Sequence, residues 1–367
     1  MKKKELFFAL VVVTVLVCGS VHAQSVPGEG VQQFADLGDL TLQNGGVIHD
    51  FRIGYRTLGT LNTDRSNAIL WPTWLGGRTE DLLPFVGAGN LTDTGKYFVI
   101  LVDSIGNGAS SSPSTSKVQP LMKFPEFSIH DMVESEHRLA TEVLHLSHLH
   151  AVIGMSMGGM QAFAWAVLYP DFMDQVIPMA GSPQSTSYDK LLWTSEIDAI
   201  ELDPAWNHGH PARPLNRGLG LAAEIESMNV TSPDYRVSHT NSKGFDAFVN
   251  GIKKNAKGGP GTACNQVRQR QAIISLNLPV ELGISLDQLA LRVKSKMLIF
   301  IPTQDHLVNP DPARRFAVAV GAPIIALDSA CGHLSFACIS VGPIVAQFLA
   351  DPASIHTQTL HEEIVTP

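Results

Sequence analysis

The 367-residue sequence has little cysteine and none of the spacings of cysteine and histidine that bind metal ions. Its four cysteines form no CxxC pair, and no HExxH motif is present. A metal site therefore has little support, and we expect none in the functional centre. Basic residues are outnumbered, because 26 Lys and Arg face 34 Asp and Glu and give a formal net charge of −8. This balance argues against nucleic acid as a partner and gives no basic surface for stable membrane association.

Long apolar runs are missing except at the N-terminus. Lysines at positions 2–4 precede the 13-residue run LFFALVVVTVLVC, and Val21-His22-Ala23 places small residues at positions −3 and −1 of a cleavage site. The pattern predicts a signal peptide over residues 1–23, cleaved near Ala23, and a periplasmic or secreted protein. An uncleaved anchor is the weaker interpretation, since a span needs ~20 residues. Loss of three lysines and one glutamate with this segment lowers the net charge to −10.

Three cysteines follow the predicted signal peptide: Cys264, Cys331 and Cys338. In an oxidising compartment two of them can form a disulfide and leave the third free. Buried free thiols are an equal alternative, because cysteine is among the most buried residue types. The spacing does not choose a pair.

Short apolar runs alternate with helical patterns along most of the chain. Seven runs predict strands, at residues 51–59, 67–72, 97–103, 150–155, 175–181, 296–302 and 323–328. Several are apolar at consecutive positions, which is typical of strands buried on both faces of a parallel sheet. Helical spacing is found at residues 128–146, 157–170 and 310–322. The alternation predicts an α/β fold with a mostly parallel, doubly wound sheet.

One long interval breaks this rhythm. Residues 183–291 contain helix-like pieces and no strong strand, and residues 207–214 and 254–265 are predicted to be loops. We interpret the interval as a helical lid inserted into a core formed by residues 24–182 and 292–367. The tail from about Ala353 has no clear pattern.

The stretch AVIGMSMGGMQAFAW (151–165) sets a serine among glycines, between an apolar strand and an apolar helix. Small residues two before and two after a serine let the chain turn sharply and lift the hydroxyl out of the sheet. Gly154, Ser156 and Gly158 have this spacing, and the required strand and helix flank them. The pattern predicts Ser156 as a nucleophile. The alternative is a glycine-rich turn that only packs the helix on the strand.

A nucleophilic serine needs a base and an orienting acid, which should follow it in the order acid, then histidine. Asp305 directly follows the strand-like run KMLIFIPTQ, and His333 lies in ACGHLSF after PIIALD. Both positions belong at the carboxyl ends of strands, where sites of open α/β sheets gather. The rival acids are Asp311 and Asp328, and the nearest rival base is His306. His208 and His210 lie in the insertion. His130, His137, His145, His148 and His150 precede the serine, out of order.

An oxyanion formed by attack on a carbonyl requires backbone N–H donors. The first is expected from the residue after the serine, Met157, and the second from the loop after an earlier strand. The loop within WPTWLGGRTED (71–81) follows such a strand and contains adjacent glycines, so we assign the second donor to Leu75. An ordinary glycine-bearing loop is the alternative.

These motifs closely resemble a known family. GMSMGGMQAFAW is similar to the nucleophile region of homoserine O-acetyltransferases, which have an α/β-hydrolase fold with a helical lid. The resemblance continues at residues 55–70, 124–139, 304–310 and 331–337. It implies Ser156 as nucleophile, Asp305 as acid and His333 as base. Relatives commonly pair through the lid, so it also implies a homodimer.

Departures from the transferases favour the hydrolase members of the same superfamily. The loop PTWLGGRTED differs in character, residues 217–240 offer no counterpart of the lid arginine that holds an amino-acid carboxylate, and DSIGNGASSSPS (103–114) resembles the GNGxSSSPS loop of hydrolases. Acetyl-CoA would also be lacking outside the cytoplasm.

We therefore expect an exported serine hydrolase that cleaves a small-molecule carboxylic ester with a short acyl group, through an acyl-enzyme and without a cofactor. The alternative is an O-acyltransferase with the same triad. A non-catalytic binding protein would lack a triad member, yet all three are present in order. Trp193, Trp206 and Tyr188 of the lid are candidate pocket residues, although large aromatics in helices are more often core.

Overall fold

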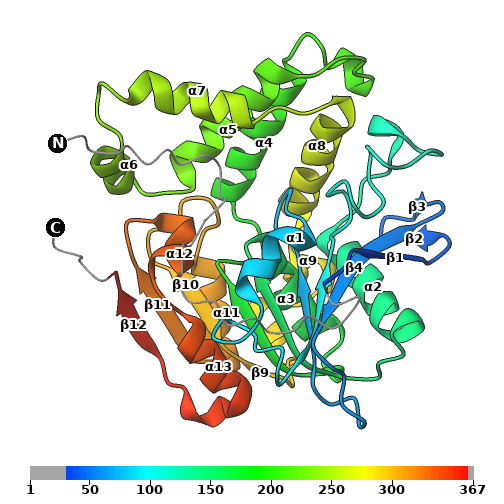
Figure 1. The fold of residues 1–367 in the computed structure, drawn as a ribbon, viewed down its shortest axis with the longest axis vertical. Helices are drawn as coiled ribbons and strands as arrows, with labels where there is room; N and C mark the ends of the chain where they lie inside the picture. The colour runs from blue at the N-terminus through cyan, green and yellow to red at the C-terminus, as the bar shows by residue number, and fades with distance from the viewer. Residues whose placement is uncertain (1–29, 363–367) are drawn as a thin grey trace.

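The computed structural model describes residues 30–362, so the predicted signal peptide at residues 1–23 lies outside the described part of the chain. A ten-stranded sheet runs through the molecule in the order β1-β4-β6-β5-β7-β8-β10-β11-β12, with β9 beside β8 (Figure 1). Its strands are β1 (Gln33–Asp36), β4 (Arg52–Leu58), β5 (Ala68–Pro72), β6 (Phe98–Val102), β7 (Leu149–Met155), β8 (Met173–Met179), β9 (Lys296–Met297), β10 (Ile299–Pro302), β11 (Ile324–Asp328) and β12 (Gln358–His361). Within this sheet, only the pairings β1–β4 and β4–β6 are antiparallel. The predicted α/β class with a mostly parallel sheet is confirmed.

Both faces of the sheet are covered, which explains the consecutive apolar residues in its strands. Leu70 and Val152 belong to one buried cluster, whereas their neighbours Ile69 and Ile153 belong to a second cluster. Successive side chains of a strand point to opposite faces, so each cluster marks one face. The first contains side chains of α2 (Ile129–Arg138), α3 (Met157–Leu168), α10 (Leu286–Ala290) and α11 (Asp311–Val320), and the second contains side chains of α1 (Thr79–Leu82) and α13 (Gly342–Ala350).

The apolar helix α3 is a core helix by burial. Residues 157–167 of α3 are all buried. Among residues 30–362, no single helix has the length and apolar composition of a membrane span; one pair bent by 80°, Gly332–Cys338 with Gly342–Ala350, passes only when the two pieces are taken together.

Seven α-helices and one short 3-10 helix (Asn207–Gly209) occupy the interval between β8 and β9. The α-helices are α4 (Ser187–Glu201), α5 (Asn216–Asn229), α6 (Pro233–His239), α7 (Phe245–Asn255), α8 (Pro260–Ser275), α9 (Leu278–Glu281) and α10. Figure 1 shows α4 to α7 gathered at one end of the molecule, with α8 running from them toward the sheet. Side chains of α4, α5 and α8 enclose a separate apolar cluster that includes Ile200, Leu219 and Val267. Helix α10, whose side chains belong to the first cluster on the sheet, packs against α11.

Some local predictions from the sequence were wrong. The patternless tail forms β12, which pairs in parallel with β11 along the edge of the sheet. Its residues QTLH are mostly exposed, so they have no apolar alternation that would predict a strand. The predicted loop at 254–265 is short, because α7 ends at Asn255 and α8 begins at Pro260, a residue favoured in the first turn of a helix. A small hairpin, β2 (Leu40–Thr41) and β3 (Val47–Ile48), was also not predicted.

Candidate active site

Ser156 lies on the turn between β7 and α3, in a backbone conformation that side chains rarely adopt. Its φ and ψ are 55° and −122°, and its N–H donates to the carbonyl of Met179 at 2.9 Å. The turn is possible because a glycine lies where the chain passes close to β5. A Cβ at Gly158 would be 2.7 Å from the carbonyl oxygen of Pro72. The serine thus sits at the carboxyl end of the central strand on a tightly packed turn.

His333 links Ser156 to Asp305. Its Nε2 lies 2.9 Å from the Ser156 Oγ, and its Nδ1 lies 2.7 Å from the Asp305 Oδ2. The side chains of His333 and Asp305 are only 4% and 1% exposed. The other carboxylate oxygen, Oδ1, accepts hydrogen bonds from the N–H groups of Leu307 and Val308, each at 2.9 Å. With both oxygens engaged, the carboxylate is fixed in position and orients the imidazole toward the serine.

The rival acids and bases lie outside this chain of contacts. His306 is exposed, and Asp311 begins α11 on the surface. Asp328 bonds Thr303 at 3.1 Å and His361 at 3.1 Å instead of His333. In the insertion, His208 and His210 are both exposed, as expected for a solvated loop.

Met157 and Leu75, the predicted oxyanion donors, carry backbone N–H groups that bond no other residue in the described range 30–362. Met157 is the first residue of α3, where a helix leaves its N–H groups without an internal acceptor. Leu75 lies in the loop after β5. The adjacent Gly76 donates its N–H to the side chain of Gln269 at 2.8 Å. A free amide directly after the serine and a second in the loop after β5 are the kind of donors that an oxyanion requires.

A buried polar network ties the start of the loop after β5 to α3. The side-chain amide of Gln161 donates to the carbonyl oxygens of Thr73 and Met157, both at 3.1 Å. The N–H of Ser104 donates to the Thr73 hydroxyl at 3.0 Å. Sequence reasoning missed Gln161. Its position four residues after Met157, on an otherwise apolar buried helix, was the available signal.

The loop after β6 braces the other end of the same segment. Asp103 is fully buried and accepts hydrogen bonds from the Thr79 N–H at 3.0 Å and from the Asn107 side chain at 2.8 Å. Asn107 also donates to the carbonyl of Gly77 at 2.9 Å. The GNGxSSSPS resemblance had marked this loop without giving these residues a role. They fix the chain after Leu75, and Gln161 and Ser104 fix Thr73 before it.

The candidate pocket residues of the lid lie in different surroundings. Trp193 is buried in the main core cluster, and Trp206 is buried within the lid's own cluster. Tyr188 is 45% exposed, and its hydroxyl bonds Asn229 at 3.1 Å. Partial burial, and then the neighbouring carboxylates of Asp189 and Asp305, raise the pKa of Tyr188.

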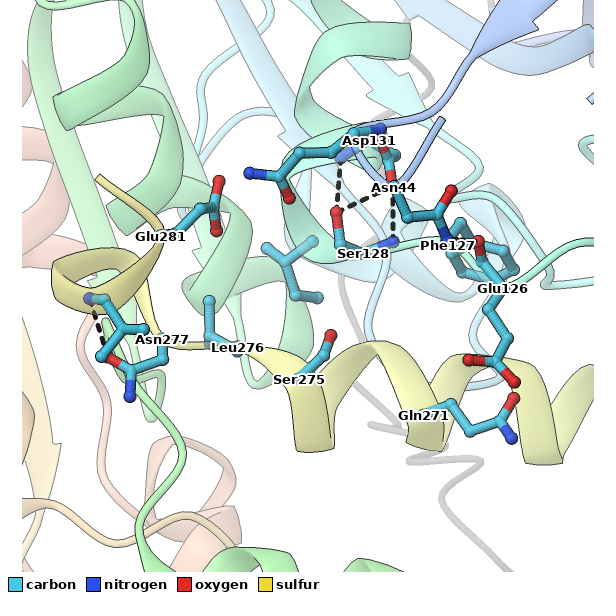
Figure 2. A pocket seen from close by; sticks show the side chains of 13 residues that line it. Asn44, Glu126, Phe127, Ser128, Asp131, Gln271, Ser275, Leu276, Asn277 and Glu281 are labelled. Carbon is cyan, nitrogen blue, oxygen red and sulfur yellow. Dashed lines mark hydrogen bonds between the residues drawn. The ribbon is translucent and has the colours of Figure 1, made fainter. Parts of the chain in front are cut away.

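A cavity also lies away from these residues, between the start of α2 and the end of α8 (Figure 2). Its lining includes Asn44, Ser128, Asp131, Gln271 and Glu281 and no member of the Ser156 site. The polar groups at its centre satisfy one another, because Asp131 accepts from both the N–H and the hydroxyl of Ser128. This cavity therefore does not belong to the serine site.

Two cysteines and one carboxylate form the described group nearest to a metal-ligand set: Cys331, Cys338 and Glu362. The cysteines are joined in a disulfide, which removes their thiolates as ligands, and Cys264 is free and buried. Of the pairings left open by the sequence, the structure forms Cys331–Cys338.

Three features together define an α/β hydrolase: a mostly parallel sheet, a serine on a sharp strand-to-helix turn, and an acid and then a histidine later in the chain. Here the histidine bonds both the serine and the acid. The family model described as alpha/beta hydrolase fold matches residues 69–336. The chain belongs to the α/β-hydrolase fold family.

Esterases and transferases are both among its relatives. The chain is similar to the probable esterase Cgl0839 of Corynebacterium glutamicum, with 38% identity over 184 residues, 49% of this chain and 53% of that protein. It is also similar to a homoserine O-acetyltransferase of Geotalea daltonii, with 36% identity, 53% of this chain and 58% of that protein. Among solved structures it resembles the acetyl esterase MekB, with a TM-score of 0.81, 27% identity, 88% of this chain and 98% of that chain. The resemblance read from the sequence is confirmed, and the match spans about half the length of the curated relatives.

Proposed function

We propose that the protein is a serine esterase that acts on small carboxylic esters. The observation that carries the proposal is the hydrogen-bonded chain from the Ser156 Oγ through His333 to Asp305. The named activities of Cgl0839 and MekB support ester cleavage, and the acetyl group in the name of MekB supports a short acyl group.

The proposed reaction has two halves. The Ser156 Oγ attacks the ester carbonyl while His333 Nε2 takes its proton, and Asp305 stabilises the imidazolium that forms. The N–H groups of Met157 and Leu75 hold the oxyanion. Collapse of the tetrahedral intermediate releases the alcohol, which receives the proton from His333, and leaves an acyl-enzyme on Ser156. Water then attacks the acyl group, with His333 again as base, and releases the acid.

Replacement of the nucleophile tests this proposal. Ser156→Ala should abolish turnover of p-nitrophenyl acetate and labelling by a fluorophosphonate probe, because no other hydroxyl contacts His333 Nε2 within the described residues. Ser195→Ala is the matched control, since the Ser195 hydroxyl donates to Leu191 of its own helix. Undiminished turnover by the Ser156 variant, with circular dichroism like that of the parent, would overturn the esterase proposal.

Acyl transfer is the second candidate, favoured by the similarity to homoserine O-acetyltransferases. Both reactions share the acyl-enzyme and differ in whether water or an alcohol accepts the acyl group. The purified protein should release free acetate from acetyl-CoA or a short ester at a rate indifferent to homoserine. Formation of O-acetyl-homoserine would instead establish the transferase.

Export is part of the proposal. A disulfide between Cys331 and Cys338 supports it, because disulfides persist in oxidising compartments. Expression of the full chain should yield a periplasmic or secreted protein whose N-terminus is Gln24. A full-length protein in the cytoplasmic fraction would contradict this.

We also propose a homodimer formed through the lid. Large apolar side chains are exposed on its helices: Leu191, Leu202, Leu221, Met228, Val237 and Phe245. A second copy would shield such side chains from water. Light scattering of the purified protein should give twice the mass of one chain, and a single-chain mass would remove the proposal.

A further inference from the structure

Gln269 connects the lid to the loop that carries Leu75. It lies on α8 and is fully buried. Its Oε1 accepts the Gly76 N–H at 2.8 Å, and its Nε2 donates to the carbonyl of Ile105 at 2.9 Å. One side chain thus bonds the loop after β5 and the loop after β6, which are 193 and 164 residues away in the sequence.

The bond to Gly76 acts on the peptide next to the proposed oxyanion donor. The Gly76 N–H belongs to the peptide that joins Leu75 to Gly76, so two backbone dihedrals of Leu75 separate it from the Leu75 N–H. Gly76 has a φ of 68°. Glycine adopts positive and negative φ with similar ease, so its own conformational preference does not hold the loop in this arrangement. Without this bond the Gly76 N–H would need another acceptor, and the loop could take a different arrangement to reach one.

Neighbouring contacts make α8 a fixed support. Asn265 lies four residues before Gln269, on the same side of the helix, and three residues before Arg268. Asn265 accepts the Ser114 N–H at 3.0 Å, and Arg268 donates to the carbonyls of Phe124 at 2.8 Å and Met122 at 2.9 Å. All three side chains are buried. Polar side chains of one helix face therefore bond core backbone along α8, and Gln269 is held by a rigid element.

On this basis, and resting on the proposed esterase function, we propose that Gln269 is a positioning residue for the oxyanion hole. It holds the peptide before Gly76 so that the Leu75 N–H points toward the oxyanion formed at Ser156. The lid then does more than shape a pocket, because α8 completes the geometry that stabilises the transition state. Gln269 contacts no reacting atom in this role.

The variant Gln269→Met tests the proposal, since it keeps the side-chain length and removes both hydrogen bonds. We expect kcat for p-nitrophenyl acetate to fall about tenfold or more, less than the 10²–10³-fold typical for loss of a donor itself, with little change in KM. Binding of a trifluoromethyl ketone, whose adduct with the serine carries an oxyanion, should weaken by the same factor. A role limited to folding would not link these two measurements.

Two further variants keep the test decisive. Gln269→Glu retains an acceptor for the Gly76 N–H, so its kcat should lie between those of Gln269→Met and the parent. This variant also tests the proposal if Gln269→Met folds poorly. Gln271→Met is the matched control, since Gln271 lies two residues away on α8 and lines the separate cavity of Figure 2. Its kcat should equal that of the parent.

The outcomes separate this inference from the proposed function. An active parent enzyme with parental kcat and ketone affinity in a folded Gln269→Met variant would overturn the positioning role alone. Loss of kcat without weaker ketone binding would also overturn it. A parent enzyme that cleaves no ester would overturn the esterase proposal and this inference together.

Discussion

Gly154 and Gly158 meet across the turn that carries Ser156. A Cβ at Gly154 would lie 1.9 Å from the carbonyl oxygen of Gly158. The atom in the way is backbone, so no side chain can rotate to make room. The end of β7 and the start of α3 therefore approach more closely than a residue with a side chain at position 154 would allow. This close approach sets the position of Ser156 above the end of the sheet.

The change Gly154→Ala should separate β7 from α3. Because a displacement of about 1 Å near reacting groups costs about 10²-fold in rate, we expect kcat/KM for a short ester to fall at least that far. The control is Gly251→Ala in α7, where an added Cβ meets nothing within 4 Å. It should keep full activity and gain up to about 1 kcal/mol in the free energy of unfolding. Equal activity of the two variants would show that the turn tolerates a side chain.

The triad could be predicted because short sequence patterns around each of its residues indicate it. The spacing around Ser156 defines the turn, and Asp305 and His333 each follow an apolar strand in an order that the fold requires. Gln269 could not be predicted in this way. It lies in a polar helical segment, RQRQ, and its role depends on two loops more than 160 residues away. The sequence contains no local sign of such a contact.

The elements of the fold also differ in how well the sequence predicted them. The strands of the sheet centre were predicted because both of their faces are buried, as in β5 and β7. The edge strand β12 was missed because its residues are mostly exposed and pair on one side only. In the lid, α6 and α7 were missed, and α7 buries only Ile252. A helix or strand could be predicted where its burial produces an apolar pattern in the sequence, and was missed where most of its residues are exposed.

The disulfide between Cys331 and Cys338 encloses the segment that carries His333. Closing this short loop should stabilise the folded state by about 2–3 kcal/mol through the entropy of the unfolded chain. We expect Cys338→Ser to lose that amount in urea denaturation and to show lower esterase activity. Addition of a reductant should lower the stability of the parent and leave the variant unchanged.

Cys264 provides the control for this experiment. Burial raises the pKa of its thiol to about 12, so it stays a neutral thiol and should not react with a thiol reagent in the native protein. The change Cys264→Ala should preserve the sensitivity of the parent to reductant. If that sensitivity disappeared with Cys264 instead of with Cys338, the assigned pairing would be wrong.

Glu136 should make the stability dependent on pH. Burial raises the pKa of its carboxyl group to about 8, while the hydrogen bond from Trp165 Nε1, at 2.7 Å, opposes the shift. The folded state therefore holds a proton that the unfolded state has lost above about pH 4.5. This contribution is fully present below that pH and declines as the pH rises toward about 8, by at most about 1.4 kcal/mol per pH unit.

The variant Glu136→Gln removes the titration and keeps an acceptor for the Trp165 N–H. Urea denaturation at about pH 5 and about pH 8 should show a larger loss of stability for the parent than for the variant over this interval. Parallel losses in the two proteins would mean that Glu136 is ionised in the folded state at about pH 5 or is reached by water.

Arg270 and Glu196 form a buried ion pair in the lid, with Nη2 and Oε2 2.6 Å apart and exposed fractions of 3% and 0%. Glu226, which is 36% exposed, lies 3.1 Å from the same guanidinium nitrogen. Burial raises the pKa of Glu196 to about 7 although Arg270 lowers it, so desolvation outweighs the attraction for this group. The pair is then costly to break and contributes little as a whole.

A single and a double variant together test this account. Arg270→Met leaves Glu196 buried without its cation and should cost about 3–5 kcal/mol in the free energy of unfolding. Replacing both residues, Arg270→Met with Glu196→Met, should restore most of that loss, since Glu226 can turn to water. A double variant as unstable as Arg270→Met alone would show that the arginine stabilises α4 against α8 by its packing and not by neutralising Glu196.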